Sequence, residues 1–263
     1  MPTTGQPISV VVLTGGPVID RQVARFLSRL EAEPGIDLLA VVSQSPVRGL
    51  RGLLSDLWKR RGALAAPILI QNLLITGVGA ALNPRAAILR RRTLRALGER
   101  IRFMDSIHSD QALELLRKLK AGMGLVYGGP IVKRKLFSIP EHGTLGIHHG
   151  KVPDYRGKKT TFWAVYNGET EVAVMIQKIS SKLDRGDVLL QATVPVRRRP
   201  LFIIKKQLED AGIDLYLEAI AAVRDGRASY SPQPAGAPIL YKDPTAIDIL
   251  RFWGKYVARL FRG

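Results

Sequence analysis

The sequence predicts an α/β fold built on a Rossmann-like, mostly parallel sheet. The prediction rests on two apolar, β-branched runs, residues 8–13 and 36–42, and on the amphipathic helical pattern that lies between them. A strand-helix-strand opening of this kind is typical of doubly wound sheets. Gly15 and Gly16 follow the first run, but no G-x-G-x-x-G pattern appears there, so a dinucleotide fingerprint is absent.

Each further element has its own pattern. The helix between the first two strands covers residues 20–30, where Val23, Phe26, Leu27 and Leu30 recur with helical spacing. From residue 109 onward we expect a helix over 110–120, a strand over 123–127, a turn at 128–130, a short helix up to 137, a strand over 144–148, a strand pair over 171–179 and 187–196, and a helix over 201–224. The strands and helices thus alternate through most of the chain.

Length and composition limit the function classes. A chain of 263 residues that is 46% hydrophobic is long enough to bury a core, which excludes a disordered protein. The absence of Cys excludes disulfides, thiolate metal sites and a Cys nucleophile. The four His residues show no metal-ligand spacing, so we expect no metal. The first apolar run is short and has no basic stretch before it, which predicts a cytoplasmic protein.

The net charge of +18 is unevenly distributed. Between residues 46 and 102, twelve Lys and Arg stand against two acidic residues. This part interrupts the strand-helix pattern, and we interpret about 46–104 as a basic helical insertion. Within it, residues 62–82 carry no charge. That segment is read in three ways: a transmembrane helix, a helix pair packed on the domain, or an insertion into a membrane surface.

The segment from 143 to 191 carries the chemistry. His148 stands at the end of a predicted strand, and Asp184 lies 36 residues later in the turn Leu-Asp-Arg-Gly-Asp. Strand-end loops on one edge of an α/β sheet are where such folds place chemistry, so we expect both side chains in one crevice.

The order of the motifs in this segment resembles that of the folate-dependent formyltransferase family, which includes glycinamide ribonucleotide, methionyl-tRNA and nucleotide-sugar formyltransferases. The motifs that carry the resemblance are His148, Val152-Pro153, Tyr155-Arg156-Gly157, Trp163-Ala164, Asn167-Gly168-Glu169 and Leu183-Asp184-Arg185-Gly186-Asp187. The similarity covers about residues 8–196 apart from the insertion.

The resemblance implies that His148 and Asp184 are the catalytic residues and that 10-formyltetrahydrofolate is the co-substrate, with no metal. It also implies a pterin pocket lined by two turns, made of Tyr127, Gly128, Gly129, Pro130, Leu183, Gly186 and Asp187. The chain departs from the family at Gly146, where the family has an Asn that donates to the formyl oxygen, and at Gln177, where it has a His. His149 and Gln177 are the candidate substitute donors.

The chain closes with a basic amphipathic helix over 246–262. Its basic residues Arg251, Lys255, Arg259 and Arg262 share one sector, and Leu250, Trp253, Val257, Leu260 and Phe261 lie on the other side. We interpret 1–199 as a formyltransferase-like catalytic domain and 200–263 as a C-terminal helical extension. The helix either docks on the domain with a solvated basic face or lies on a membrane surface.

Three functions remain open at this point. The first is formyl transfer to a small-molecule or lipid-linked amine, such as an amino sugar or envelope precursor, by a peripheral protein at the inner face of an anionic membrane. The second is a methionyl-tRNA formyltransferase-like enzyme, which the charge suits. It is less favoured because only about 65 residues follow the catalytic region, too few for a separate tRNA-binding domain. The third is a formyltransferase-like protein that binds but no longer catalyses, because of Gly146.

Overall fold

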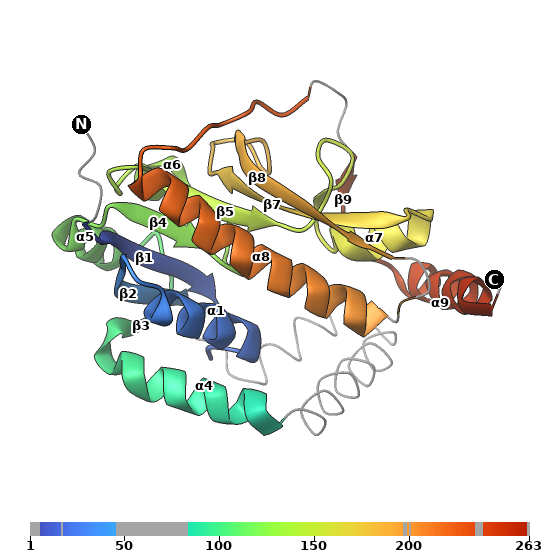
Figure 1. The fold of residues 1–263 in the computed structure, drawn as a ribbon, viewed down its shortest axis with the longest axis horizontal. Helices are drawn as coiled ribbons and strands as arrows, with labels where there is room; N and C mark the ends of the chain where they lie inside the picture. The colour runs from blue at the N-terminus through green and yellow to red at the C-terminus, as the bar shows by residue number, and fades with distance from the viewer. Residues whose placement is uncertain are drawn as a thin grey trace.

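The structure is a computed structural model, and it describes residues 6–16, 18–45, 84–196, 199, 201–234 and 239–261. At its centre is a seven-stranded sheet with the order β3-β2-β1-β4-β5-β7-β8 (Figure 1). The strands are β1 (Ile8–Gly15), β2 (Ile36–Gln44), β3 (Ile101–Met104), β4 (Met123–Val126), β5 (Thr144–His148), β7 (Glu171–Lys178) and β8 (Val188–Pro195). The pairs from β3 to β5 are parallel, whereas β7 and β8 are antiparallel additions. The predicted α/β fold with a mostly parallel sheet is confirmed.

Helices connect these strands, and α1 and α5 begin at side-chain caps. They are α1 (Arg21–Ala32), α4 (Pro84–Leu97), α5 (Asp110–Leu119), α6 (Arg134–Phe137), α7 (Thr160–Asn167), α8 (Leu201–Arg224) and α9 (Ala246–Phe261), with a 3-10 turn, η2, at Gly98–Arg100. The carboxylate of Asp20 accepts from Gln22 N and Val23 N at the start of α1, each at 2.8 Å. Ser109 caps α5 in the same way through Ala112 N. Lys120 ends α5 in the left-handed conformation.

The central strands are buried on both faces, which explains why their sequences are apolar throughout. Along β1, Val10 and Val12 contribute to a core with α1 and α8, while Val11 and Leu13 contribute to a second core with α5 and α6. A third cluster joins β7 and β8 to α7 and α8. The three clusters hold the ends of β4, β5 and β7 in fixed positions.

Helix α8 crosses the sheet on the same face as α1 (Figure 1). Its Tyr216 is fully buried, and the hydroxyl donates to Leu145 O at 2.8 Å and accepts from Val126 N at 3.1 Å. Those two backbone groups belong to β5 and β4, next to the strand ends. The phenol of Tyr216 therefore fixes α8 to the two neighbouring parallel strands.

The chain after α8 returns along the sheet to the loop that follows β5. Ser231 forms an isolated bridge with Val188, and β9 (Leu240–Tyr241) pairs in parallel with β6 (Arg156–Gly157). Helix α9 then docks through Phe252, which is buried and lies 4.6 Å from the Phe162 ring. Ile247, Leu250 and Trp253 are exposed on α9. The structure does not describe the side chains of Val257, Arg259, Leu260, Phe261 and Arg262.

The predicted basic insertion is described only in its last part. Residues 46–83, which include the uncharged segment 62–82, lie outside the described residues. Residues 84–104 belong to the fold: α4 packs on α1, and β3 pairs with β2 in register Val41 to Ile101. The division into 1–199 and 200–263 stays a prediction, although α8 supplies part of the main core. Within the described ranges, no helix combines the length and apolar character of a membrane span.

Candidate active site

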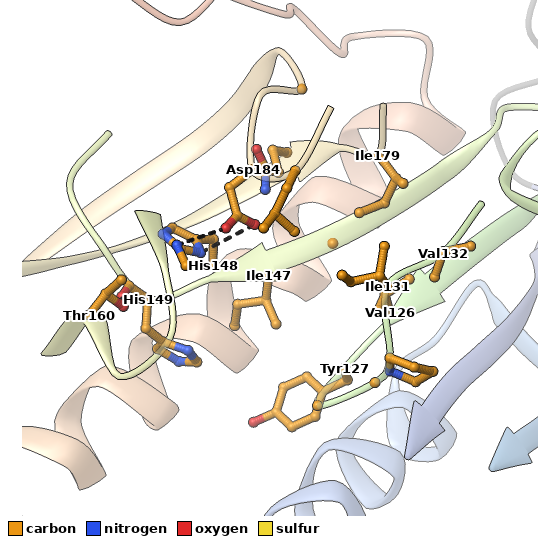
Figure 2. A pocket seen from close by; sticks show the side chains of 18 of the residues that line it. Val126, Tyr127, Ile131, Val132, Ile147, His148, His149, Thr160, Ile179 and Asp184 are labelled. Carbon is orange, nitrogen blue, oxygen red and sulfur yellow. Dashed lines mark hydrogen bonds and ion pairs between the residues drawn. The ribbon is translucent and has the colours of Figure 1, made fainter. Parts of the chain in front are cut away.

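A cavity of about 580 Å³ opens at the carboxyl ends of β4 and β5 (Figure 2). One side is formed by the turn from Val126 to Val132, and the other by the turn that follows β7, from Gln177 to Gly186. The floor is the end of β5, from Gly146 to His148, with His149 after it. Ligands of α/β folds bind at such strand ends, and the volume is in the ordinary range for small-molecule pockets.

His148 and Asp184 meet in this cavity, as the sequence predicts. The His148 side chain is 7% exposed, and its Nδ1 lies 3.5 Å from Oδ1 of Asp184. Asp184 adopts a left-handed backbone conformation with φ 49°, which directs its side chain back over the end of β5. Its other oxygen, Oδ2, accepts from Gly157 N at 3.1 Å. The carboxylate therefore joins the turn after β7 to the strand β6.

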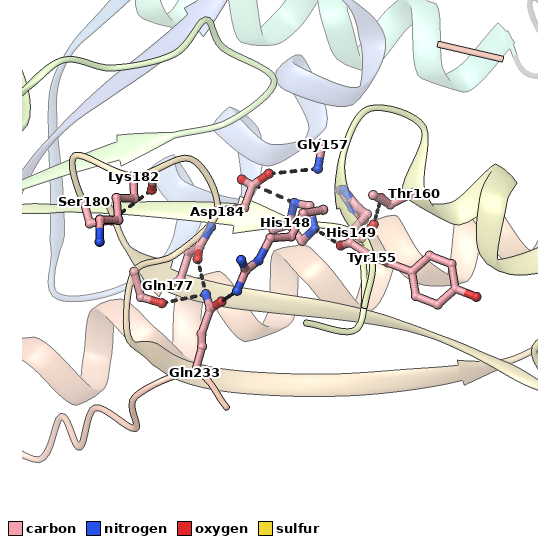
Figure 3. Close-up of polar contacts among 12 residues, drawn as sticks. His148, His149, Tyr155, Gly157, Thr160, Gln177, Ser180, Lys182, Asp184 and Gln233 are labelled. Atoms are coloured by element: carbon pink, nitrogen blue, oxygen red, sulfur yellow. Dashed lines mark hydrogen bonds and ion pairs between the residues drawn. The ribbon is translucent and has the colours of Figure 1, made fainter. Parts of the chain in front are cut away.

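The second ring nitrogen of His148 defines its protonation pattern. Nε2 lies 2.8 Å from Tyr155 O (Figure 3). A carbonyl oxygen only accepts, so Nε2 carries the proton in this arrangement. Nδ1 then faces a carboxylate, and that contact is attractive only when the ring is protonated or when a proton is shared with Asp184. The pair is thus arranged to hold and exchange a proton.

His149 has a different environment from its neighbour. Its Nε2 is buried and has no hydrogen-bond partner within the described part of the chain. Burial, assisted by the proximity of His148, lowers the pKa of His149 to about 4. The ring is uncharged at neutral pH. His149 lines the same cavity as His148, but as a neutral imidazole.

Gln177 also lines the cavity, opposite Gly146 in the β5–β7 register. Its side chain is buried, and Oε1 accepts from Nε2 of Gln233 at 3.0 Å. Gln233 lies in the segment after α8, and no sequence motif points to it. The structure brings the two candidate donors His149 and Gln177 to the same cavity as His148.

The far end of the cavity contains charged residues that sequence reasoning missed. Lys159 at the start of α7 and Lys205 and Glu209 on α8 line it, together with Gln22, which hydrogen-bonds to Glu209. Burial raises the pKa of Glu209 to about 7 and lowers the pKa of Lys205. The only sequence signal for them is the helical period of residues 201–224, which places Lys205 and Glu209 on one face of the helix. That period does not show whether the face borders a cavity or solvent.

The sequence profile of the family described as "Formyl transferase" matches residues 93–220, a range that contains β5, His148 and Asp184. Residues 93–220 therefore resemble a formyl transferase domain, and we call them the formyl transferase domain. The chain is 26% identical over 166 residues to a methionyl-tRNA formyltransferase from Bacteroides fragilis, covering 60% of this chain and 50% of the relative. It spans about half the length of the curated relatives it matches.

Solved structures share the fold over a longer range. Glycinamide ribonucleotide transformylase 1 from Symbiobacterium toebii has a TM-score of 0.59 at 18% identity, covering 90% of this chain and 96% of that chain. A formyltetrahydrofolate deformylase from Pseudomonas syringae has a TM-score of 0.55 at 16% identity, covering 84% of this chain and 63% of that chain. At these identities the likeness concerns the fold.

Gly146 is the position at which the resemblance leads us to expect an Asn, and a side chain there would meet Ile179. A Cβ atom at this position would lie 2.4 Å from Cδ1 and 3.3 Å from Cγ1 of Ile179. Ile179 follows β7 and lines the same cavity. The space that a side chain at 146 would need is therefore already filled by Ile179, and the two positions are sterically matched.

Most of the predicted pterin-binding residues line the cavity of the formyl transferase domain. Tyr127, Gly128, Gly129, Pro130, Leu183 and Gly186 do so, whereas Asp187 is not among the lining residues. The carbonyl of Asp187 instead accepts from Lys178 N at 2.9 Å, which closes the turn that holds Asp184. Across the described ranges, no group of three or more potential metal ligands is found.

Proposed function

We propose that this protein transfers a formyl group from 10-formyltetrahydrofolate to a primary amine. The observation that carries the proposal is the pairing of buried His148 with Asp184 on the floor of a cavity in a formyl transferase domain. Formyl transfer creates a negative oxygen in a tetrahedral species, and it moves a proton from the attacking amine to the departing folate nitrogen. A protonated His148 supplies charge next to that oxygen, and Asp184 holds or relays the proton.

We propose that this cavity holds the pterin end of such a folate. Gly128 and Gly129 carry no side chains, so backbone groups of the turn after β4 reach the cavity. Val126 and Ile179 supply apolar contacts beside them (Figure 2). Leu183 and Gly186 close the opposite wall. Flat heterocycles are bound by this combination of apolar walls and backbone hydrogen-bonding groups.

For the acceptor we propose the amino group of an aminoacyl-tRNA first and an amino sugar or lipid-linked amine second. The curated relatives that support the first choice are methionyl-tRNA formyltransferases. The net charge of +18 suits a polyanion. The second choice rests on the sequence alone. The charged end of the cavity, with Lys159, Lys205 and Glu209, is where either acceptor would enter.

The test is an assay of tetrahydrofolate release from 10-formyltetrahydrofolate with methionyl-tRNA and with a panel of amino sugars. His148→Asn and Asp184→Asn should each lower the rate by at least about a hundredfold. The matched controls His142→Asn and Asp154→Asn change exposed residues and should leave the rate unchanged. Wild-type activity that survives both site substitutions would refute the catalytic pair. Folate binding without transfer to any acceptor would favour a binding protein.

We further propose that α9 contacts an anionic membrane surface. Ile247, Leu250 and Trp253 are 59%, 73% and 41% exposed, and they form an apolar stripe beside Arg251 and Lys255. Leu250→Asp should abolish co-flotation with vesicles containing phosphatidylglycerol. Ile239→Asp changes an exposed apolar residue outside α9 and should retain it. If the wild-type protein does not float with such vesicles, the location is wrong.

A further inference from the structure

Gln233 ties three parts of the site together from outside the matched formyl transferase domain. Its Oε1 accepts from Nη2 of Arg156 at 2.7 Å, and its Nε2 donates to Gly186 O at 2.8 Å and to Gln177 Oε1 at 3.0 Å (Figure 3). Gly186 belongs to the turn that carries Asp184, and Gln177 lies on β7 beside Gly146. One side chain therefore contacts β6, β7 and the catalytic turn.

The chemistry of these partners leaves one orientation for each amide. The Arg156 guanidinium has only donors, and the Gly186 carbonyl has only an acceptor. Gln233 must therefore turn its oxygen to Arg156 and its nitrogen to Gly186. Because that nitrogen also meets Gln177, the oxygen of Gln177 is the atom that faces Gln233. The Arg156 guanidinium therefore determines the orientation of Gln177 through Gln233.

The remaining group of Gln177 is its Nε2. Within the described residues it makes no hydrogen bond, although the side chain is only 3% exposed and lines the cavity. Gln177 stands opposite Gly146, the position at which the expected donor is missing. Arg156 is itself buried at 3% exposure, and its charge strengthens the first hydrogen bond of the chain.

We infer that Gln233 is a positioning residue that turns the side-chain NH₂ of Gln177 toward the substrate oxygen, in place of the donor that Gly146 cannot supply. The inference rests on the proposed formyl transfer, because that reaction is what needs a donor at this point. The polar chain runs from Arg156 through Gln233 to Gln177 and ends in the cavity. A residue after α8 thereby helps the site to recognise a substrate oxygen, which accepts the hydrogen bond from Gln177.

Gln233→Glu tests this role with little change in shape. A carboxylate still accepts from Arg156, but it no longer donates, so Gln177 must reverse its amide and present oxygen to the cavity. We expect kcat to fall by about tenfold to a hundredfold, with a smaller change in the KM for 10-formyltetrahydrofolate. Gln191→Glu, an exposed position on β8, is the matched control and should leave kcat unchanged.

A double-mutant cycle separates positioning from general damage. In a Gln177→Leu background there is no amide to orient, so Gln233→Glu should cost only what the lost hydrogen bond to Gly186 O costs, and the fall in kcat should be severalfold smaller than in the wild-type background. An equal loss in both backgrounds, or wild-type kcat for Gln233→Glu alone, would overturn the inference.

A measurement without turnover keeps the inference distinct from the proposed function. Hydrogen exchange of glutamine side-chain amides, followed by NMR, should show the Gln177 NH₂ unprotected in the wild-type protein. The same group should become protected in Gln233→Glu, where it donates to the new carboxylate. A Gln177 NH₂ that is already protected in the wild-type protein overturns the orientation, whether or not any acceptor is formylated. Absence of formyl transfer with the expected exchange pattern would instead refute the proposed reaction.

Discussion

Gly146→Asn introduces the side chain that the resemblance leads us to expect, and the structure indicates that this change alone is costly. The new Cβ would lie 2.4 Å from Ile179 Cδ1, well inside contact distance, and Val126 Cβ is 4.0 Å away on another side. Overpacking of a filled site costs about 1–3 kcal/mol. The clash is with the end of a flexible side chain, and removal of a strand glycine returns about 0.5–1 kcal/mol. We expect a net loss of about 1–2 kcal/mol.

That loss corresponds to a decrease in Tm of roughly 2–8 °C for a chain of this size, measurable by calorimetry. Because Ile179 still occupies the space, the new amide should not reach the substrate oxygen, and the rate of formyl transfer should rise by less than about threefold. Gly254→Asn is the matched control, since no atom lies within 4 Å of a Cβ there.

The double variant Gly146→Asn/Ile179→Ala removes the obstacle. Its free energy of unfolding should be about 1–2 kcal/mol higher than the value obtained by adding the two single effects, as expected for residues in direct contact. Relative to Ile179→Ala alone, the restored donor should raise kcat by up to about a hundredfold. The steric argument fails if Gly146→Asn by itself retains the wild-type Tm and raises kcat by a similar factor.

Three further predictions concern stability. His149 has a pKa of about 4 in the folded chain and 6.5 when unfolded, so its contribution to the folding stability is complete above pH 6.5 and is lost as the pH falls toward 4. His149→Phe should therefore reduce the difference in unfolding free energy between pH 7.5 and pH 4.5 by on the order of 2 kcal/mol. Glu209 has a pKa raised to about 7, so the protein loses stability as the pH rises from 4.5 through 7. After discounting for solvent exposure, Glu209→Gln should raise the stability at pH 8 relative to pH 5 by about 1 kcal/mol in denaturant titrations, and an unchanged pH profile would contradict this. Tyr216→Phe leaves Val126 N and Leu145 O without their partner and should lower the stability by about 1–3 kcal/mol, while equal melting curves would show that the hydroxyl contributes nothing.

The parts of the fold that the sequence predicts are those with strong local periodicity. The runs at 8–13 and 36–42 are apolar because parallel strands are buried on both faces, and that burial is visible in the composition. β3 could not be found in this way, because its four residues are half-exposed edge positions that bring no apolar run. The register of β2 with β3 is set by tertiary contacts, which the local sequence pattern does not reveal.

The candidate site likewise contains residues that the sequence predicts and residues that it does not. His148 and Asp184 could be predicted because each lies in a motif with fixed spacing. Gln233 could not, because it contacts Gln177 across 56 residues of chain and lies in no motif. The role of Ile179 was equally hidden, since an apolar residue at the end of a strand does not reveal which backbone position it covers.

The return of the chain to the loop after β5 has a consequence for how the protein is made. Gln233 follows Asp184 by 49 residues, so at synthesis rates of about 5–20 residues per second it leaves the ribosome about 2–10 s after Asp184. Until then β6 has no partner strand, and Arg156 lacks the oxygen that receives its hydrogen bond. A nascent chain that has not yet supplied Gln233 therefore lacks the hydrogen bond that Gly186, in the turn that carries Asp184, accepts from this side chain.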